Sequence, residues 1–165
     1  PILTKKITYL SLFTAIAIIL GYIESLIPFS FSIPGSKIGL ANIINIIILY
    51  YYSIKETLIV SLLRCLIIAI TFTNLYMFLY SISGAILSIL IMYLLKQTKS
   101  FSILIISITG AVSHNLGQLI IAIIFLGFNI IYYLPYLIII ACITGTLMGL
   151  IAISVIKKLG YPKIS

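Results

Sequence analysis

The side chains that could do chemistry in this sequence are amides and one imidazole, and they stand inside apolar segments. Asn42 and Asn45 follow a proline–glycine turn and a lysine in the stretch PGSKIGLANIINIIILYY. His114, Asn115 and Gln118 stand in a second stretch, GAVSHNLGQ. Neither a nucleophile–base pair nor a phosphate-binding loop accompanies them. The residue types therefore favour binding through hydrogen bonds over catalysis.

Acidic residues are too few for metal-dependent chemistry. The chain has no aspartate, and its two glutamates, Glu24 and Glu56, are far apart. His114 has no acidic or cysteine neighbour at the spacing of metal ligands. We expect no catalytic residue, no metal site and no cofactor.

Composition identifies the solvent in which these residues must be positioned. Of 165 residues, 63% are hydrophobic and only 7% are charged, with a mean hydropathy of +1.35. Soluble domains average about 25% charged residues, so the sequence predicts an all-α integral membrane protein, a single domain over residues 1–165. The net charge of +8 comes from cations between apolar runs, and no nucleic-acid partner is expected. Cys65 and Cys142 fall inside apolar segments, so a disulfide is not expected either.

Six apolar segments approach the roughly 20 residues that a helix needs to cross a bilayer. The second is short, which favours either a helix with little tilt or a re-entrant start. The first lacks a small-residue cleavage site, so no cleavable signal peptide is expected. The predicted helices are about Ile7–Ile27, Ile38–Tyr52, Glu56–Thr73, Leu75–Leu95, Phe101–Leu126 and Leu134–Ile156.

Lysines in the connections predict the orientation of this six-helix bundle. With six spans, eight of them fall on one side, namely Lys5, Lys6, Lys55, Lys96, Lys99, Lys157, Lys158 and Lys163. The other side has only Lys37. Positive residues collect on the cytoplasmic side, so both termini are predicted to be cytoplasmic in a multi-pass membrane protein.

With this orientation, most polar residues of the spans map to the outer half of the membrane. Unpaired polar groups are costly in hydrocarbon, so they should face the bundle interior or a wet cavity. We predict an outward-facing substrate pocket, with the loop Pro28–Lys37 as its lid. Hydrogen bonds that merely hold helices together remain the alternative for each residue. The predicted substrate-binding residues are Glu24, Lys37, Asn42, Asn45, Tyr76, Tyr80, His114, Asn115 and Gln118.

Two further features concern packing and partners. Arg64 falls near the centre of the third helix, where either a structural role or a contact with a substrate or partner would explain it. Small residues at four-residue spacing let helices approach closely. In the first helix, Ala15, Ala17 and Gly21 are the candidates for docking another membrane subunit.

Four stretches resemble, in order and spacing, a bacterial membrane family known as heptaprenyl diphosphate synthase component I, or Gx transporter family. They are PGSKIGLANIINIIILYY, ETLIVSLLRCLI, SISGAILSILIMYLL and ITGAVSHNLGQLIIA, and the resemblance extends from about Thr14 to Leu150. That family is similar to the substrate-binding S-components of energy-coupling factor (ECF) vitamin importers, which have six helices and both termini inside. The resemblance implies a capture subunit that works with a transmembrane coupling subunit and two cytoplasmic ATPases.

The enzymatic part of the family name fits the residues poorly. Polyprenyl synthases need aspartate-rich motifs that hold Mg²⁺ against diphosphate oxygens, and this chain has no aspartate. The name therefore indicates a pathway connection, which makes an isoprenoid or prenylated precursor a candidate cargo. We predict an ECF-type substrate-binding subunit in contact with membrane lipid. The alternatives are a non-catalytic membrane partner of a prenyl-diphosphate synthase and a stand-alone carrier, although the acidic pair that proton coupling usually needs is missing.

Overall fold

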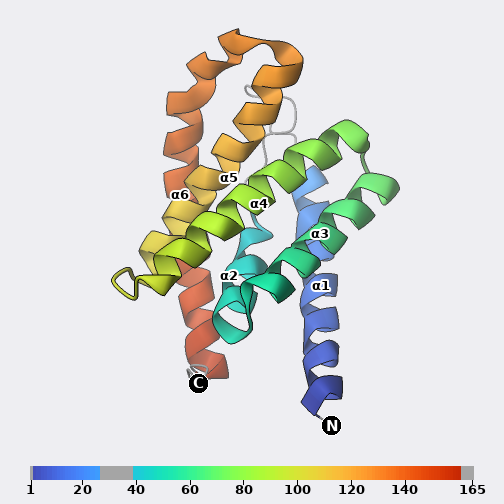
Figure 1. The fold of residues 1–165 in the computed structure, drawn as a ribbon, viewed down its shortest axis with the longest axis vertical. Helices are drawn as coiled ribbons and strands as arrows, with labels where there is room; N and C mark the ends of the chain where they lie inside the picture. The colour runs from blue at the N-terminus through green and yellow to red at the C-terminus, as the bar shows by residue number, and fades with distance from the viewer. Residues whose placement is uncertain (1, 27–38, 161–165) are drawn as a thin grey trace.

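The computed structural model describes residues 2–26 and 39–160. This part of the chain consists of helices joined by irregular connections and contains no strands (Figure 1). The all-α prediction is confirmed. Predicted site residue Lys37 and the predicted lid Pro28–Lys37 lie outside the described residues. The elements are α1 (Ile2–Leu26), α2 (Asn42–Tyr51), α3 (Ile54–Thr71), α4 (Leu75–Gln97), α5 (Ile103–Leu126), the 3₁₀ helix η1 (Phe128–Tyr133) and α6 (Leu134–Leu159).

Local signals explain where the helix ends differ from the predicted ones. Helix α2 begins at Asn42 instead of residue 38, and the φ of +84° at Gly39 is incompatible with a helix there. Helix α3 begins two residues early because Ser53 and Glu56 form a capping box. Helices α1, α4 and α6 extend past the apolar runs to include lysines, whose long stems tolerate a helix end at the membrane surface.

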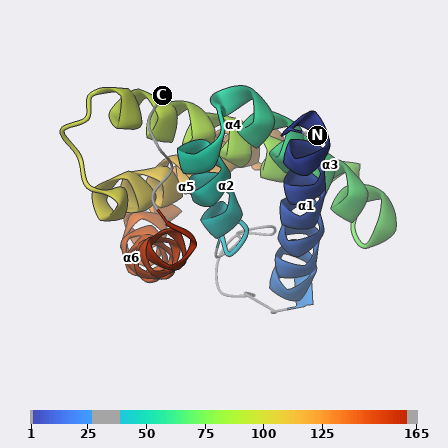
Figure 2. The ribbon, with the colours of Figure 1, turned by 90° about the horizontal axis from the view of Figure 1, so that it is seen from below.

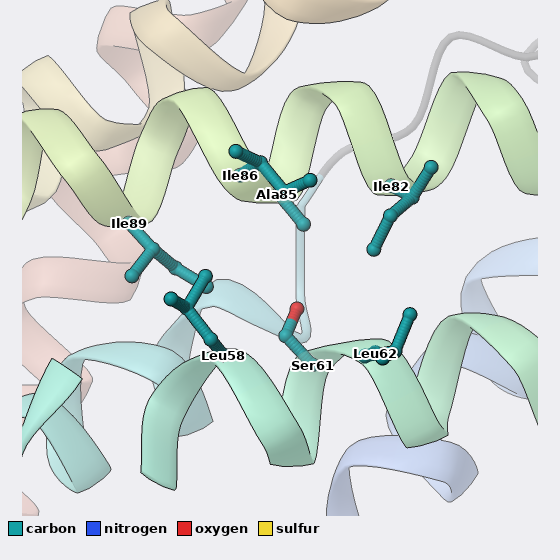
Figure 3. Close-up of a pocket in the computed structure, with 7 residues that line it drawn as sticks. All are labelled: Leu58, Ser61, Leu62, Ile82, Ala85, Ile86 and Ile89. Carbon is teal, nitrogen blue, oxygen red and sulfur yellow. The ribbon is translucent and has the colours of Figure 1, made fainter. Parts of the chain in front are cut away.

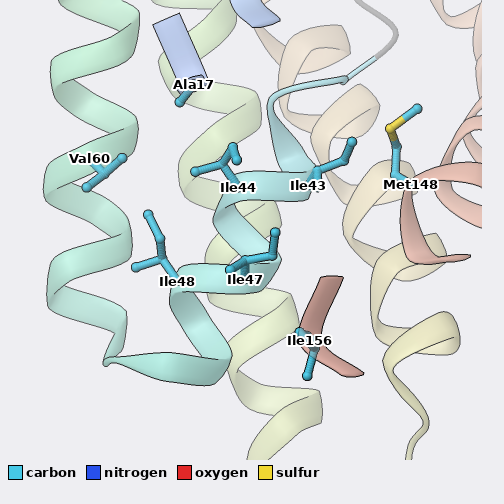
Figure 4. Packing of buried hydrophobic residues seen from close by; sticks show 8 residues of the cluster. All are labelled: Ala17, Ile43, Ile44, Ile47, Ile48, Val60, Met148 and Ile156. Carbon is cyan, nitrogen blue, oxygen red and sulfur yellow. The ribbon is translucent and has the colours of Figure 1, made fainter. Parts of the chain in front are cut away.

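Helix α2 occupies the middle of the molecule, as the two perpendicular views show (Figures 1 and 2). Residues 42–49 are all buried, including the asparagines. Ile44 and Ile48 meet Val60 of α3, and the same apolar cluster includes Met148 of α6 (Figure 4). Because a helix that is apolar on all sides must be buried on all sides, α2 forms the core around which the longer helices pack.

The longer helices pack in the order α1, α3, α4, α5 and α6, with each of them in contact with the next. The start of α1 and the end of α6 lie at the same end of the molecule (Figure 1). The α2–α3 and α4–α5 connections lie toward that end, whereas the α3–α4 and α5–α6 connections lie toward the other. In the described residues, the lysines of the connections are therefore gathered toward one end.

Four segments of the described chain are long and apolar enough to cross a membrane: α1, α4, α5 and the region of η1 and α6. The chain is therefore a multi-pass membrane protein. Helix α2 has ten residues and rises only about 15 Å, so it does not cross a bilayer by itself. Helix α3 is not among the four, and it carries Lys55, Glu56 and Arg64. That the chain crosses the membrane six times stays a prediction.

Polar contacts fasten α2 at its C-terminal end. Lys96 Nζ of α4 donates a hydrogen bond to the carbonyl oxygen of Leu49 at 2.5 Å. Tyr51 Oη donates to the carbonyl oxygens of Ile156 and Gly160 near the end of α6, at 3.2 and 2.5 Å. A cation beside the last carbonyls of a helix is favourable because those groups carry partial negative charge. The short helix is thereby held in register with α4 and α6.

Candidate functional site

The centre of the candidate site is a close crossing of α4 and α5. A Cβ atom added to Gly117 would lie 2.7 Å from the carbonyl oxygen of Ser83 and 2.8 Å from the Cα of Gly84. Ser83 Oγ donates a hydrogen bond to the carbonyl oxygen of Gly117 at 2.7 Å. Ser88 Oγ reaches the carbonyl oxygen of Gly110 in the same way, at 2.8 Å. Small residues let the two backbones touch, and the serines satisfy their own hydroxyls across the contact.

His114 and Gln118 stand on α5 at this crossing. A Cβ on Gly84 would lie 3.0 Å from His114 Cε1 and 3.1 Å from Gln118 Cγ, so both side chains pack on that glycine. His114 is 3% exposed and Gln118 is 4% exposed. Gln118 Nε2 has no hydrogen-bond partner within the described part of the chain. This buried donor is available to an acceptor from outside the described residues.

Asn115, the neighbour of these residues on α5, has a different role. Its Nδ2 donates a hydrogen bond to the carbonyl oxygen of Leu137 in α6 at 3.0 Å. Ser107 Oγ makes a second link from α5 to α6, to the carbonyl oxygen of Gly145 at 2.7 Å. Asn115 therefore holds two helices together, although its prediction as a substrate ligand is untested.

Asn42 and Asn45 begin the buried helix α2. They are 5% and 1% exposed, and Asn45 Nδ2 donates a hydrogen bond to Asn42 Oδ1 at 3.3 Å. The Nδ2 of Asn42 has no hydrogen-bond partner in residues 2–26 and 39–160. The two asparagines thus form one hydrogen bond with each other, and the Nδ2 of Asn42 remains a buried donor without a partner among the described residues.

Glu24 connects α1 to the turn that precedes α2. Its carboxylate accepts hydrogen bonds from the backbone amides of Gly39 and Leu40, the latter at 3.4 Å, and it is 5% exposed. A carboxylate near the first turn of a helix is favourable because the amide groups there carry partial positive charge. Glu24 therefore fixes the position from which Asn42 projects.

Tyr76 and Tyr80 lie one turn apart on α4, and their hydroxyl oxygens are 3.1 Å apart. The ring of Tyr80 is fully buried and packs with Leu119 of α5 and Leu137 of α6. The Tyr76 ring meets Phe125 edge-on at 4.8 Å. Tyr80 is thus part of the apolar core, and Tyr76 is the partly exposed member of the pair.

The structure divides the predicted site into separate groups. Glu24 is connected to the start of α2, and Asn42 contacts Asn45. His114 and Gln118 share the Gly84 contact. That the predicted residues line one outward-facing pocket stays a prediction.

The predicted docking residues of α1 do not share one environment. Ala17 and Gly21 are buried, and a Cβ on Gly21 would collide with Ile68 Cδ1 of α3. Ala15 is exposed. Ala17 and Gly21 pack inside the chain, which leaves Ala15 as the one of the three on the outer surface.

Arg64 is buried between α3 and α1 and is 5% exposed. Its guanidinium Nη2 lies 3.4 Å from Cys65 Sγ, and its side chain approaches Gly21. The Nε atom has no hydrogen-bond partner in the described residues. The side chain therefore stays inside the bundle instead of reaching the surface.

A cleft between α3 and α4 was not expected from the sequence. It has a volume of about 150 Å³ (Figure 3). Periodicity shows which face of a helix is apolar but not where two neighbouring helices leave space. The lining residues are Leu58, Ser61, Leu62, Ile82, Ala85, Ile86 and Ile89.

The acidic residues are arranged unlike those of a metal-dependent synthase. Glu56 forms an ion pair with Lys6 and caps α3, whereas Glu24 binds backbone amides. The described residues contain no group of three or more His, Cys, Asp or Glu side chains that could hold a metal ion.

Comparison with known proteins gives one match. A family model described as heptaprenyl diphosphate synthase component I matches residues 13–155, which include all four stretches that suggested this family. No curated protein and no solved structure matches the chain. The description names one component of a synthase, which agrees with the expectation that the chain is not itself an enzyme. The chain is a multi-pass membrane protein that belongs to the heptaprenyl diphosphate synthase component I family.

Proposed function

We propose that the chain is the substrate-binding membrane subunit of an ECF-type importer. It captures a small, partly apolar molecule in a pocket that opens to the outside. The observation that carries this proposal is a pair of buried donors, Asn42 Nδ2 and Gln118 Nε2, without hydrogen-bond partners in the described residues. A buried donor left unsatisfied costs about 1–3 kcal/mol, and a ligand acceptor offsets that cost.

The surroundings of these donors indicate the kind of ligand. Both are N–H groups, so each selects a carbonyl, ether or anionic oxygen. Their neighbours along the chain, Ile43 and Leu119, are buried and apolar. Small-molecule sites commonly combine an apolar wall with a few polar anchors. An isoprenoid or prenylated precursor with oxygen atoms at one end meets both requirements, and the family name supports this cargo class.

The proposal includes six membrane crossings, both termini in the cytoplasm, and an energising module made of a transmembrane coupling subunit and ATPases. The start of α1 and the end of α6 lie at one end of the molecule, which supports an even number of crossings (Figure 1). The sequence has no phosphate-binding loop to energise uptake by itself. The exposed side of α1 that includes Ala15 is the surface proposed for the coupling subunit.

The test separates binding from folding. The purified protein is extracted, and co-purifying small molecules are identified by mass spectrometry. Binding of the identified molecule is then measured for Asn42→Ala and Gln118→Ala. Each should weaken binding by about 1–3 kcal/mol. Gln118→Ala should change the melting temperature of the ligand-free protein little, because its Nε2 has no partner among the described residues. Asn42→Ala should lower that temperature somewhat, because it also removes the oxygen that accepts from Asn45 Nδ2.

Asn115→Ala is the matched control, because it removes an amide that bonds to α6. This variant should lower the melting temperature of the ligand-free protein. If Asn42→Ala and Gln118→Ala behave in the same way, with affinity per folded molecule unchanged, the amides only hold helices together and the proposed pocket is wrong.

The family match favours a second candidate function, a non-catalytic membrane partner of a prenyl-diphosphate synthase. In that case the chain should co-purify with a catalytic synthase component, and its removal should lower prenyl-transfer activity at the membrane. Retained activity without the chain, together with a bound small molecule, would favour the importer subunit.

A further inference from the structure

The cleft between α3 and α4 has an inner floor and an open side. Ser61, Ala85 and Ile89 form the floor and are at most 1% exposed. Leu62 and Ile86 stand at the rim and are 47% and 42% exposed (Figure 3). The cleft therefore opens sideways on the surface of the bundle. Because Ile86 lies near the middle of α4, a helix long enough to cross a membrane, this opening faces the bilayer.

Ser61 is the polar residue of the cleft, and its hydroxyl points into it from α3 (Figure 3). Serine and threonine inside helices usually donate to the carbonyl oxygen four residues earlier. Thr57 does so with Ser53 at 2.9 Å, and Ser81 does so with Met77 at 2.8 Å. Ser61 Oγ has no hydrogen-bond partner anywhere in the described ranges, although it is fully buried.

Water is a poor occupant of this site. A buried water needs about two to four polar partners, whereas Ser61 is the one polar side chain among the described residues that line the cleft. An apolar cavity of about this volume in another protein stays dry and admits benzene, so the space suits about six carbon atoms. A longer molecule must leave through the opening between Leu62 and Ile86.

We propose that this cleft binds an apolar chain that carries one uncharged oxygen and enters from the bilayer. The oxygen pairs with the Ser61 hydroxyl, which satisfies two groups that have both lost water. The branched walls of leucine and isoleucine hold about one five-carbon unit of the chain. A phosphate or diphosphate head is not expected there, because none of the described residues that line the cleft is cationic. The cleft includes none of the residues of the proposed outer pocket. The proposal for the cleft therefore does not depend on the existence of that pocket.

The experiment uses the full chain in lipid nanodiscs and a farnesol derivative that carries a photoreactive diazirine. Cross-linked peptides are mapped by mass spectrometry and should include residues 58–62 and 82–89. Farnesol should compete with labelling about two- to twelvefold better than farnesene, the matching hydrocarbon without oxygen, which is the range one hydrogen bond supplies. Farnesyl diphosphate should compete no better than farnesene.

Two variants and a control locate the interaction. Ser61→Ala should make farnesol and farnesene equal competitors, and it removes no hydrogen bond made by the described residues. Ala85→Leu should fill the cleft and abolish labelling of both segments without lowering the melting temperature. Ser154→Ala, on the exposed side of α6, should leave labelling unchanged.

Labelling that avoids both segments, or that persists unchanged in a folded Ala85→Leu protein, would show that the cleft does not bind the chain. Equal competition by farnesol and farnesene in the unmodified protein would overturn the role of Ser61.

Discussion

The contact between α4 and α5 can be tested by adding one methyl group. In Gly117→Ala, the new Cβ would meet the carbonyl oxygen and carbon of Ser83 and the Cα of Gly84, at 2.7–2.9 Å. These are backbone atoms, so the helices must separate. Overpacking of this kind costs about 1–3 kcal/mol. Separation also weakens the hydrogen bond from Ser83 Oγ to the carbonyl oxygen of Gly117, worth about 0.5–1.5 kcal/mol.

A gain in helix propensity opposes this loss of stability. Alanine is favoured over glycine inside a helix by about 1 kcal/mol. The expected net loss for Gly117→Ala is therefore about 0.5–3.5 kcal/mol of the free energy of unfolding. Because His114 and Gln118 pack on Gly84 at the same crossing, binding of the ligand should weaken as well.

Gly110→Ala is the matched control on the same helix. Its Cβ would meet Met92 Sδ and Cγ at 2.5 and 2.7 Å, but a methionine side chain is flexible and can move away. The helix-propensity gain should offset this rearrangement, so the stability should stay within about 1 kcal/mol of the unmodified protein. Both variants are compared by thermal unfolding in detergent. Equal stability of the two variants would refute the backbone contact between α4 and α5.

Three further predictions concern topology, docking and the end of α2. Single cysteines introduced at Asn129 and at Gln97 in a cysteine-free background should differ in their reaction with a membrane-impermeant thiol reagent. The cysteine at Asn129 should react in whole cells, and the one at Gln97 only after permeabilisation. The reverse result would overturn the predicted orientation. Ala15→Leu should weaken capture of the coupling subunit without changing the melting temperature of the chain. Ala17→Leu should lower that melting temperature because Ala17 is buried. Equal melting temperatures of the two variants would contradict the different environments of these residues. Lys96→Met should lower the free energy of unfolding by about 0.3–1 kcal/mol, because it removes the hydrogen bond to the last turn of α2. High salt should have little effect on the stability of the variant. An unchanged free energy of unfolding would show that this contact does not stabilise the fold.

Several features followed from the sequence because they depend on local composition. The apolar content required an all-helical membrane protein. Small residues four positions apart, such as Ala141, Gly145 and Gly149 in the last helix, are typical of close helix packing. In the structure, a Cβ on Gly145 would lie 2.7 Å from the Cα of Ile108 in α5, which confirms that packing. The family motifs around Asn42 and His114 were likewise recognisable, since they depend on residue order alone.

The partners of the polar residues were decided by the tertiary structure. Asn115 and Gln118 are close in sequence and both are buried, yet one donates to α6 and the other leaves a donor without a partner in the described residues. Likewise, Ala15 and Ala17 are only two positions apart, but Ala17 is buried in a cluster with residues of α2, α3 and α6 whereas Ala15 is exposed. Periodicity gives the direction of a side chain on its own helix, whereas its partner depends on the tilt and crossing point of a neighbouring helix. Those are fixed by long-range packing, such as the Gly84–Gly117 contact, which no single segment encodes.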